Sequence, residues 1–258
     1  MIMGRRSKVT EEFKFNKNEI KNDFNDFSSK HVNDNLIRKV MSMDDINIKV
    51  KCLNETQKLL KKSIEEKDLV ISVGPAGTGK TFLSLLTALH LMKMNKEYQK
   101  LVLVKSVQSI QGEEIGFLKG DMIDKMTPYM YSFTSNLDQI FNSKQITKIL
   151  LESGVIEYQP LAFCRGITFT NSIIIVDEIQ NINMNTFKTI ISRIGIGSKM
   201  IFLGDKDQID MKNPKDTCIN RVAEKFKGKD FIDIIEFNKS ESVRHPLIPE
   251  ILTIIEEE

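Results

Sequence analysis

A glycine-rich segment that ends in a lysine and a threonine constrains this chain more than any other feature. Residues 74–81 read Gly-Pro-Ala-Gly-Thr-Gly-Lys-Thr, which matches the phosphate-binding loop pattern G-x-x-x-x-G-K-[ST]. The apolar run 69–73 precedes the loop, and an apolar helical pattern over residues 82–89 follows it. Because this loop requires a strand before it and a helix after it, the context favours the match over a flexible glycine-rich turn. The segment predicts a nucleotide-binding α/β domain.

The residue types in this loop suit the binding of a nucleotide. Glycines let the backbone turn its N–H groups toward phosphate oxygens, at the positive end of the helix that begins there. We expect Lys80 to reach the β and γ phosphates of ATP and the Thr81 hydroxyl to bind Mg²⁺. The predicted nucleotide contacts in the loop are Gly74, Pro75, Ala76, Gly77, Thr78, Gly79, Lys80 and Thr81.

Length and composition narrow the class of protein. A chain of 258 residues can bury one substantial core together with an extension. Its net charge of +2 argues against a protein that coats nucleic acid electrostatically, and leaves a local basic groove open. No apolar run has the length of a membrane span and the first residues lack a hydrophobic signal core, so we expect a cytoplasmic protein. The cysteines are widely spaced and odd in number, which predicts reduced core thiols at Cys52, Cys164 and Cys218.

From residue 68 onward, apolar runs alternate with helical patterns. The runs are continuous and rich in β-branched residues, as is typical of parallel strands buried on both faces. The sequence therefore predicts an α/β fold with a mostly parallel sheet and helices on both faces. The predicted strands are residues 69–73, 101–104, 173–176, 200–203 and 231–235.

The chain outside these runs divides into an extension and an insertion. Residues 1–50 are dense in Lys, Asn, Asp and Glu without a clear helix or strand period, which predicts a polar and partly disordered extension. Residues 51–258 are predicted to form the folded domain. Within it, residues 111–165 form an insertion before the third strand, helical from about 120 to 151 with a break at Pro128.

The third predicted strand ends in an acidic pair, Asp177 and Glu178. Ligands of open α/β sheets bind at the carboxyl ends of the strands, so these acids are expected beside the phosphate loop. We expect Asp177 to hold Mg²⁺ together with Thr81, and Glu178 to polarise a water molecule that attacks the γ phosphate. The alternative is a surface acidic pair at a strand end.

Two further residues complete the predicted catalytic set with Lys80 and Glu178. Gln208 follows the fourth strand closely, where its amide can contact a phosphoryl oxygen or the attacking water. Arg244 follows the fifth strand and can supply positive charge to the transition state, within one subunit or across an interface. A surface arginine ahead of a proline-started helix is the alternative for Arg244.

Taken together, these motifs resemble the PhoH-like family of ATPases, and in particular its phage-type members. The resemblance extends from about Cys52 to the C-terminus, with the motifs in order. It is carried by residues 74–81, 111–121, 160–166, 177–181, 193–199, 204–205 with 208, and 243–246.

The resemblance implies a RecA-like P-loop NTPase, related to the first motor lobe of superfamily 1 helicases, with the helical insertion before the Walker B strand. It implies ATP and Mg²⁺ as cofactors, a homo-oligomeric ring with a hexamer as one option, and single-stranded RNA or DNA as a partner. A chain encoded by a phage would act in the host cytoplasm. The family pattern also implies that Gln57, three residues after the possible helix cap Asn54, reads adenine. Its implied nucleic-acid contacts are Lys105, Gln108 and Arg165.

Two departures from the family pattern reduce the arginine content of the implied nucleic-acid contacts. The family usually has Arg-Pro where this chain has Lys105 and Ser106, and Arg-Gly-Arg where this chain ends the motif in Ile167. A neutral isoleucine cannot bind phosphate, so the prediction of ATP hydrolysis is stronger than that of unwinding.

The leading hypothesis is a Mg²⁺-dependent ATPase whose hydrolysis is coupled to binding or unwinding of single-stranded RNA or DNA. A second hypothesis is an ATP-gated switch without motor activity, in which nucleotide orders the insertion for a partner. A small-molecule kinase is a third, and the acidic pair with Gln208 suits water activation better than transfer to an acceptor.

Overall fold

The computed structural model describes residues 46–106, 128–211, 213–243 and 251. Most of the predicted extension, together with Gln108 and Arg244, lies outside these described residues. The predicted boundary of the domain at residue 51 falls inside a packed segment, because Ile46 and Ile48 are buried in the core. The carbonyl of Ile46 also accepts a hydrogen bond of 2.8 Å from Lys93 Nζ.

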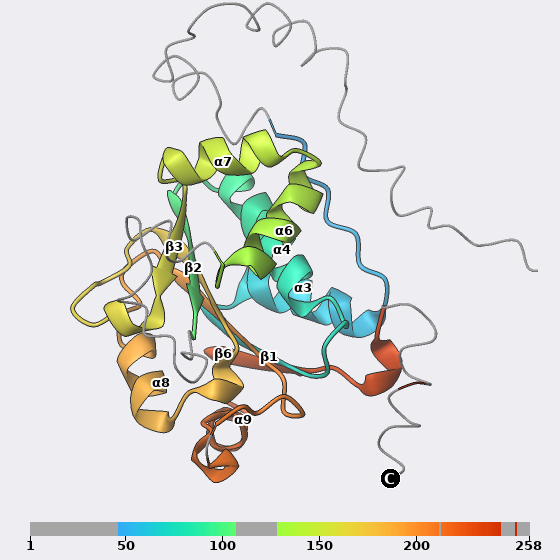
Figure 1. Cartoon of the computed structure of the whole chain (residues 1–258), viewed down its shortest axis with the longest axis vertical. Helices are drawn as coiled ribbons and strands as arrows, with labels where there is room; N and C mark the ends of the chain where they lie inside the picture. Colours follow the sequence, from blue (N-terminus) through green and yellow to red (C-terminus); the bar gives the residue numbers. More distant parts are fainter. Residues whose placement is uncertain (1–45, 107–127, 212, 244–250, 252–258) are drawn as a thin grey trace, which may run out of the picture.

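A single sheet of six strands forms the centre of the described structure (Figure 1). All of its strand pairs are parallel, and their order across the sheet is β3-β2-β4-β5-β1-β6. The strands are β1 (Leu69–Val73), β2 (Lys100–Lys105), β3 (Ile156–Pro160), β4 (Ser172–Asp177), β5 (Lys199–Gly204) and β6 (Ile232–Glu236). This arrangement confirms the predicted α/β fold of the RecA-like P-loop type.

Helices cover both faces of the sheet, as predicted (Figure 1). Two clusters of buried apolar side chains fill the space between the helices and the two faces of the sheet. The helices on one face are α3 (Glu55–Glu66), α4 (Lys80–Met94), α6 (Tyr131–Phe141) and α7 (Lys144–Glu152). Those on the other face are α8 (Met184–Ile191) and α9 (Ile219–Phe226). Short 3-10 turns follow β3, β4 and β6 and precede α9, at residues 161–163, 179–181, 239–241 and 214–216.

Strand β3 is the one element of the sheet that the sequence does not predict. It lies at the edge of the described sheet, where its pairing partner is β2. Its residues, Ile-Glu-Tyr-Gln-Pro, are mostly half-buried rather than apolar, because an edge strand is covered less completely than a central one. The proline at its end is also typical of an edge position. The described part of the predicted insertion therefore contains two helices, α6 and α7, followed by this strand.

The strand order brings the predicted functional segments to one edge of the sheet. Strand β5 separates β1, which leads into the phosphate loop, from β4, which ends in Asp177. All strands are parallel, so the carboxyl ends of β1, β4 and β5 face the same side. The segments after these strands, which carry Lys80, Glu178 and Gln208, are therefore neighbours in space although they are far apart in the sequence.

Candidate active site

The phosphate loop joins β1 to α4, and two of its glycines are required by its geometry. Gly79 has φ of 85° and stands directly before α4, a left-handed conformation that side chains disfavour. Gly74 has φ of 152°, and a Cβ atom on it would lie 2.6 Å from Cβ of Phe237. The backbone of the loop therefore turns where a larger residue does not fit, and its N–H groups remain available to an anion at the start of α4.

Lys80 is buried and its ammonium group lies over the loop. Its Nζ donates hydrogen bonds of 2.6 Å and 2.8 Å to the carbonyl oxygens of Gly74 and Pro75. The ammonium group therefore lies beside the loop, from where a lysine of this motif can reach a phosphate that the loop holds.

Thr81 and Asp177 meet at the base of the site, as the sequence suggests for a Mg²⁺ site. Thr81 Oγ1 donates to Asp177 Oδ2 over 3.3 Å, which connects the start of α4 to the end of β4. A hydroxyl and a carboxylate oxygen are hard ligands of the type that Mg²⁺ prefers, and the ion keeps its other positions for water and phosphate. No group of three or more His, Cys, Asp or Glu side chains suited to a metal ion occurs in the described part of the chain.

Glu178 adopts an unusual backbone conformation next to Asp177. Its φ of 61° and ψ of 40° lie in the left-handed region, which is rare for a residue with a side chain. Its Oε2 accepts a hydrogen bond of 2.5 Å from Gln180 Nε2, and its Oε1 lies 3.6 Å from Lys105 Nζ. The carboxylate is thus held at both oxygens at the mouth of the site.

These residues border one pocket of about 320 Å³. The pocket also reaches the turn after β5, where Asp205 is buried and Gln208 is exposed. The lining residues that the sequence predicts are Ala76, Gly77, Gly79, Lys80, Thr81, Asp177, Glu178 and Gln208. The predicted catalytic and metal-binding residues that the structure describes are therefore gathered in one place.

Helix α6 contributes two pocket residues that sequence reasoning did not find. Ser132 and Asn136 stand one helical turn apart and both line the same pocket. They come from the insertion, between β2 and β3, and no motif marks them. Their spacing of four residues predicts only that they share a face of a helix, and nothing in the sequence predicts that this face covers the nucleotide site.

Gln57 lies against the phosphate loop, on α3. Its backbone N–H donates to Asn54, which caps this helix as the sequence suggests. Its side-chain Nε2 donates to the carbonyl of Thr78 over 3.0 Å, and its Oε1 accepts from the N–H of Leu53 over 2.8 Å. The amide is nearly inaccessible and bonded to protein at both ends, so its predicted contact with adenine stays a prediction.

The two described candidates for nucleic-acid contact occupy different environments. Arg165 is exposed and lines a second pocket, of about 490 Å³, beside Ser106 and Phe163. Lys105 points inward, with a side chain only 18% exposed, and its Nζ donates to Ser132 Oγ over 3.0 Å. The family pattern gives Arg165 and Lys105 the same role, but the structure places them in different environments.

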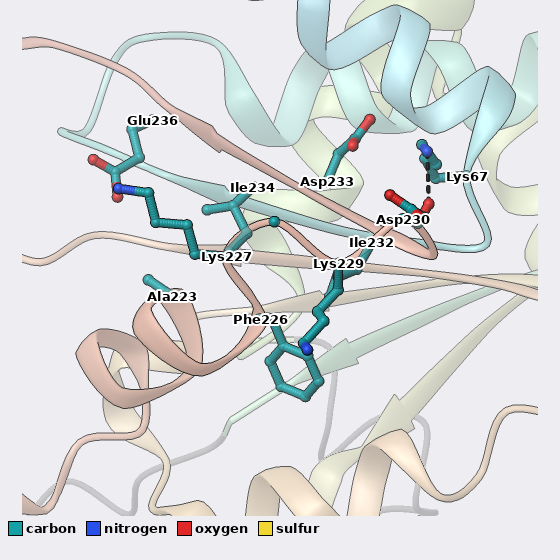
Figure 2. Close-up of a pocket in the computed structure, with 11 residues that line it drawn as sticks. Lys67, Ala223, Phe226, Lys227, Lys229, Asp230, Ile232, Asp233, Ile234 and Glu236 are labelled. Carbon is teal, nitrogen blue, oxygen red and sulfur yellow. Dashed lines mark hydrogen bonds between the residues drawn. The ribbon is translucent and has the colours of Figure 1, made fainter.

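A further pocket, of about 440 Å³, lies between β6 and α9 (Figure 2). Its lining mixes lysines with acids, and Figure 2 shows Lys67 bonded to Asp230, whose carbonyl accepts from Lys67 Nζ over 2.7 Å. Its described lining contains none of the predicted site residues. Its balanced charge and the absence of those residues from its described lining make it a poor candidate for the active site.

Two of the cysteines, Cys164 and Cys218, are buried, and Cys52 is half-buried. All three cysteines are free thiols, and burial raises the pKa of Cys164 and of Cys218 to about 12, so neither is ionised at neutral pH. Among the helices that the structure describes, none combines the length and the apolar character that a membrane crossing requires.

We predict that Mg²⁺ binding weakens sharply in mild acid. Burial and, to a smaller extent, the neighbouring charge of Glu178 raise the pKa of Asp177 to about 6, although Lys105, Lys80 and the N–H of Glu178 oppose the shift. A metal ligand must be deprotonated, so protons compete with Mg²⁺ below this pKa, and the affinity should fall about tenfold for each pH unit well below it. Magnesium-dependent binding of a fluorescent ATP analogue, titrated between about pH 7.5 and about pH 5, measures this. The same titration of Asp177→Asn should be weak at every pH, and a pH-independent affinity of the unaltered protein would contradict the prediction.

Comparison with known proteins places this site in a family. A model described as PhoH-like protein matches residues 49–256. A PhoH-like protein of Bacillus subtilis (strain 168) is 36% identical over 206 residues, which cover 80% of this chain and 63% of that protein. Protein PhoH of Escherichia coli (strain K12) is 32% identical over 197 residues, which cover 75% of this chain and 54% of that protein.

Among solved structures, the large terminase from a thermophilic bacteriophage matches with a TM-score of 0.47 and 13% identity, over 79% of this chain and 50% of that chain. The present chain spans between 45% and 63% of the length of curated relatives that it matches, with 63% for the protein of Bacillus subtilis and 58% for that of Synechocystis. Because the family model matches most of the chain and the site motifs lie within the matched residues, the chain belongs to the PhoH-like protein family.

Proposed function

We propose that this protein is an ATPase that uses Mg²⁺. The observation that carries the proposal is the convergence of the phosphate loop, Thr81, Asp177, Glu178 and Gln208 on one pocket. Thr81 and Asp177 are separated by 3.3 Å, as suits two ligands of one small cation. An arrangement of this kind binds the phosphates of a nucleotide and places a carboxylate where a water molecule can attack.

Each residue of the pocket has a separate task in this proposal. The loop N–H groups and Lys80 bind the β and γ phosphates, and Thr81 and Asp177 hold Mg²⁺. The ion, when bound, would neutralise charge that develops on the phosphates. Glu178 polarises the attacking water, and Gln208 orients that water or a phosphoryl oxygen. The small-molecule kinase is disfavoured, because the acidic pair with Gln208 suits activation of water better than transfer to an acceptor.

Single-stranded RNA or DNA is the partner that we propose for this ATPase. The pocket beside Arg165 is lined by the half-exposed ring of Phe163 and by the amide and hydroxyl side chains of Asn183 and Thr186. No carboxylate occurs among the described residues that line it. An aromatic face for stacking, a cation for phosphate and amides for base edges suit an unpaired nucleotide. The pocket opens beside the segment that follows β4, a few residues from Glu178.

Assembly is part of the same proposal. No arginine lies among the described residues that line the nucleotide pocket, so an arginine that adds to the charge of Lys80 at the transition state would come from elsewhere in the chain or from a neighbouring subunit. We propose Arg244 for this role, in a homo-oligomeric ring that gives a single motor lobe the neighbours it needs to move on a strand. We propose the cytoplasm as its place of action, which is the host cytoplasm for a phage-encoded chain.

The ATP-gated switch stays as a second candidate, because helix α6 lines the nucleotide pocket through Ser132 and Asn136. A helix of the insertion that contacts the nucleotide would transmit the presence of the γ phosphate to a partner, with hydrolysis acting as a timer.

One measurement separates these candidates. The rate of phosphate release is followed with ATP and Mg²⁺, with and without single-stranded RNA or DNA, on a sample of known assembly state. A rate that rises several-fold with nucleic acid supports the motor. A rate indifferent to nucleic acid, with an assembly state that changes with ATP, supports the switch. A protein that releases no phosphate under any of these conditions is not the ATPase that we propose.

We predict that Phe163→Ala weakens binding of single-stranded RNA or DNA about tenfold, because stacking of one base on an aromatic ring contributes about 1–3 kcal/mol. Fluorescence anisotropy of a short labelled strand measures the dissociation constant. Phe231→Ala is the matched control, because that ring is also exposed, at 55% against 50% for Phe163, and does not line this pocket. Equal affinities of the two variants would exclude Phe163 as a stacking surface.

A further inference from the structure

The Glu178 carboxylate is held by two side chains, those of Lys105 and Gln180. The left-handed backbone of Glu178 costs conformational energy, so it persists only where surrounding contacts maintain it. Hydrogen bonds to Asp177 and from Asn181 hold its backbone, and Lys105 and Gln180 hold its side chain, one at each oxygen. The contact from Lys105 depends on where the ends of β2 and β4 lie relative to each other, whereas Gln180 follows Glu178 by two residues in the same segment.

Lys105 approaches Glu178 from β2. It pairs in register with Asp177 on the adjacent strand β4, so its position is set by the sheet itself. Its Nζ lies 3.6 Å from Glu178 Oε1 and 3.0 Å from Ser132 Oγ, on helix α6. A lysine that binds the backbone of a nucleic acid is expected to extend into solvent, whereas this one is directed at a catalytic carboxylate and at the helix that covers the pocket.

Gln180 binds the other oxygen of the same carboxylate. It is completely buried and its Nε2 donates to Glu178 Oε2 over 2.5 Å. Its Oε1 accepts a hydrogen bond of 3.1 Å from the N–H of Asp205, at the start of the turn that carries Gln208. One amide therefore connects the proposed general base to the turn whose Gln208 is proposed to orient the attacking water or a phosphoryl oxygen. Its own carbonyl accepts from Thr217 Oγ1 over 2.6 Å, which fixes the backbone as well.

We propose that Lys105 and Gln180 are positioning residues of the hydrolytic site, and that Lys105 acts on ATP turnover through Glu178 rather than as a contact to nucleic acid. The inference rests on the proposed ATPase function and concerns how its base is held. Two neighbouring carboxylates, Asp177 and Glu178, repel each other, and a cation beside them keeps Glu178 turned toward the pocket. Since a reacting group displaced by about 1 Å can lose about a hundredfold in rate, loss of this support should appear in turnover.

Lys105→Met tests the inference, because methionine keeps the length of the side chain and removes its charge. We expect kcat without nucleic acid to fall about tenfold or more, while KM for ATP and the affinity for a labelled single strand stay within about threefold of their original values. Lys105→Arg should restore part of the loss, because it returns a cation to the same place. A merely structural role would not separate kcat from KM in this way.

Lys100→Met is the matched control. Lys100 is the first residue of β2, at the opposite end of this strand from Lys105, and is also paired with a glutamate, Glu157. Its replacement should leave kcat unchanged. The inference about Lys105 is overturned if Lys105→Met turns over ATP at the original rate, whether or not it loses affinity for nucleic acid. An unaltered protein without any turnover refutes the ATPase proposal itself, so the two failures are distinguishable.

Gln180→Glu tests the second residue separately. A carboxylate at this position can still accept from the N–H of Asp205, but when ionised it cannot donate to Glu178. We expect kcat to fall about tenfold or more with little change in KM, as for Lys105→Met. An original kcat in this variant, with an unaltered melting temperature, would restrict Gln180 to holding the Asp205 turn.

Discussion

Glu178→Gln is expected to bind ATP and Mg²⁺ but to turn over at least about a hundredfold more slowly, because a general base contributes about 10²–10⁴ in rate. The substitution keeps the size of the side chain and its ability to accept from Gln180. It removes the charge that faces Lys105 and the basicity that a water molecule needs. Phosphate release measures the turnover, and a fluorescent ATP analogue measures the binding.

The control for this prediction is Glu157→Gln. Glu157 is also paired with a lysine of β2, but it stands on β3 at the far end of that strand and outside the nucleotide pocket. Its replacement should leave turnover unchanged and should lower stability only slightly, because the pair is exposed. Retained turnover in Glu178→Gln would remove Glu178 from the role of base, and loss of ATP binding in the same variant would indicate damage to the pocket instead.

The central strands were predictable because a strand buried on both faces has a continuous run of apolar residues. Strand β4 is almost wholly buried and reads as a continuous apolar run up to Asp177, and β5 behaves in the same way. Strand β3 lacks such a run because most of its residues are only half-buried at the edge of the sheet. Its glutamate and glutamine make it resemble a loop, although it pairs with β2 along its whole length.

The residues of the pocket were predictable where a motif fixes their place relative to the end of a strand. Thr81 and Asp177 stand at such places, and parallel strands bring those places together. Ser132 and Asn136 were not predictable, because their role depends on how α6, a helix within a long insertion, packs against the rest of the domain. The inward direction of Lys105 was not predictable either, since a lysine at a strand end has many rotamers and only the neighbouring Ser132 and Glu178 select one.

The position of α6 connects the two functional hypotheses. A switch and a motor both need a part of the protein that contacts the nucleotide and also contacts something else. Helix α6 meets the nucleotide pocket through Ser132 and Asn136, and meets the end of β2 through the hydrogen bond from Lys105. Under either hypothesis, α6 is therefore placed to change its position or contacts when a nucleotide binds. The two hypotheses differ in what that change affects: movement on a strand for the motor, or binding of a partner for the switch.

Lys80→Ala is expected to raise the dissociation constant for ATP about ten- to hundredfold and to abolish turnover. A hydrogen bond to a charged group contributes about 1.5–3 kcal/mol, and this ammonium group is the cation that the loop itself provides for the phosphates. Its bonds to the carbonyls of Gly74 and Pro75 would also be lost, so the protein should become slightly less stable. Isothermal titration with ATP and a thermal melt separate the loss of affinity from the loss of stability.

Lys199→Ala provides the comparison that makes this loss specific. Lys199 is likewise buried, and its Nζ donates to a backbone carbonyl, that of Lys67, over 2.6 Å. It begins β5, at the opposite end of that strand from the nucleotide pocket, so its replacement should cost about 1 kcal/mol of stability and no affinity for ATP. If both variants lose affinity to the same extent, the effect of Lys80→Ala comes from general destabilisation. If only Lys80→Ala loses affinity, the ammonium group at the start of α4 binds the nucleotide directly.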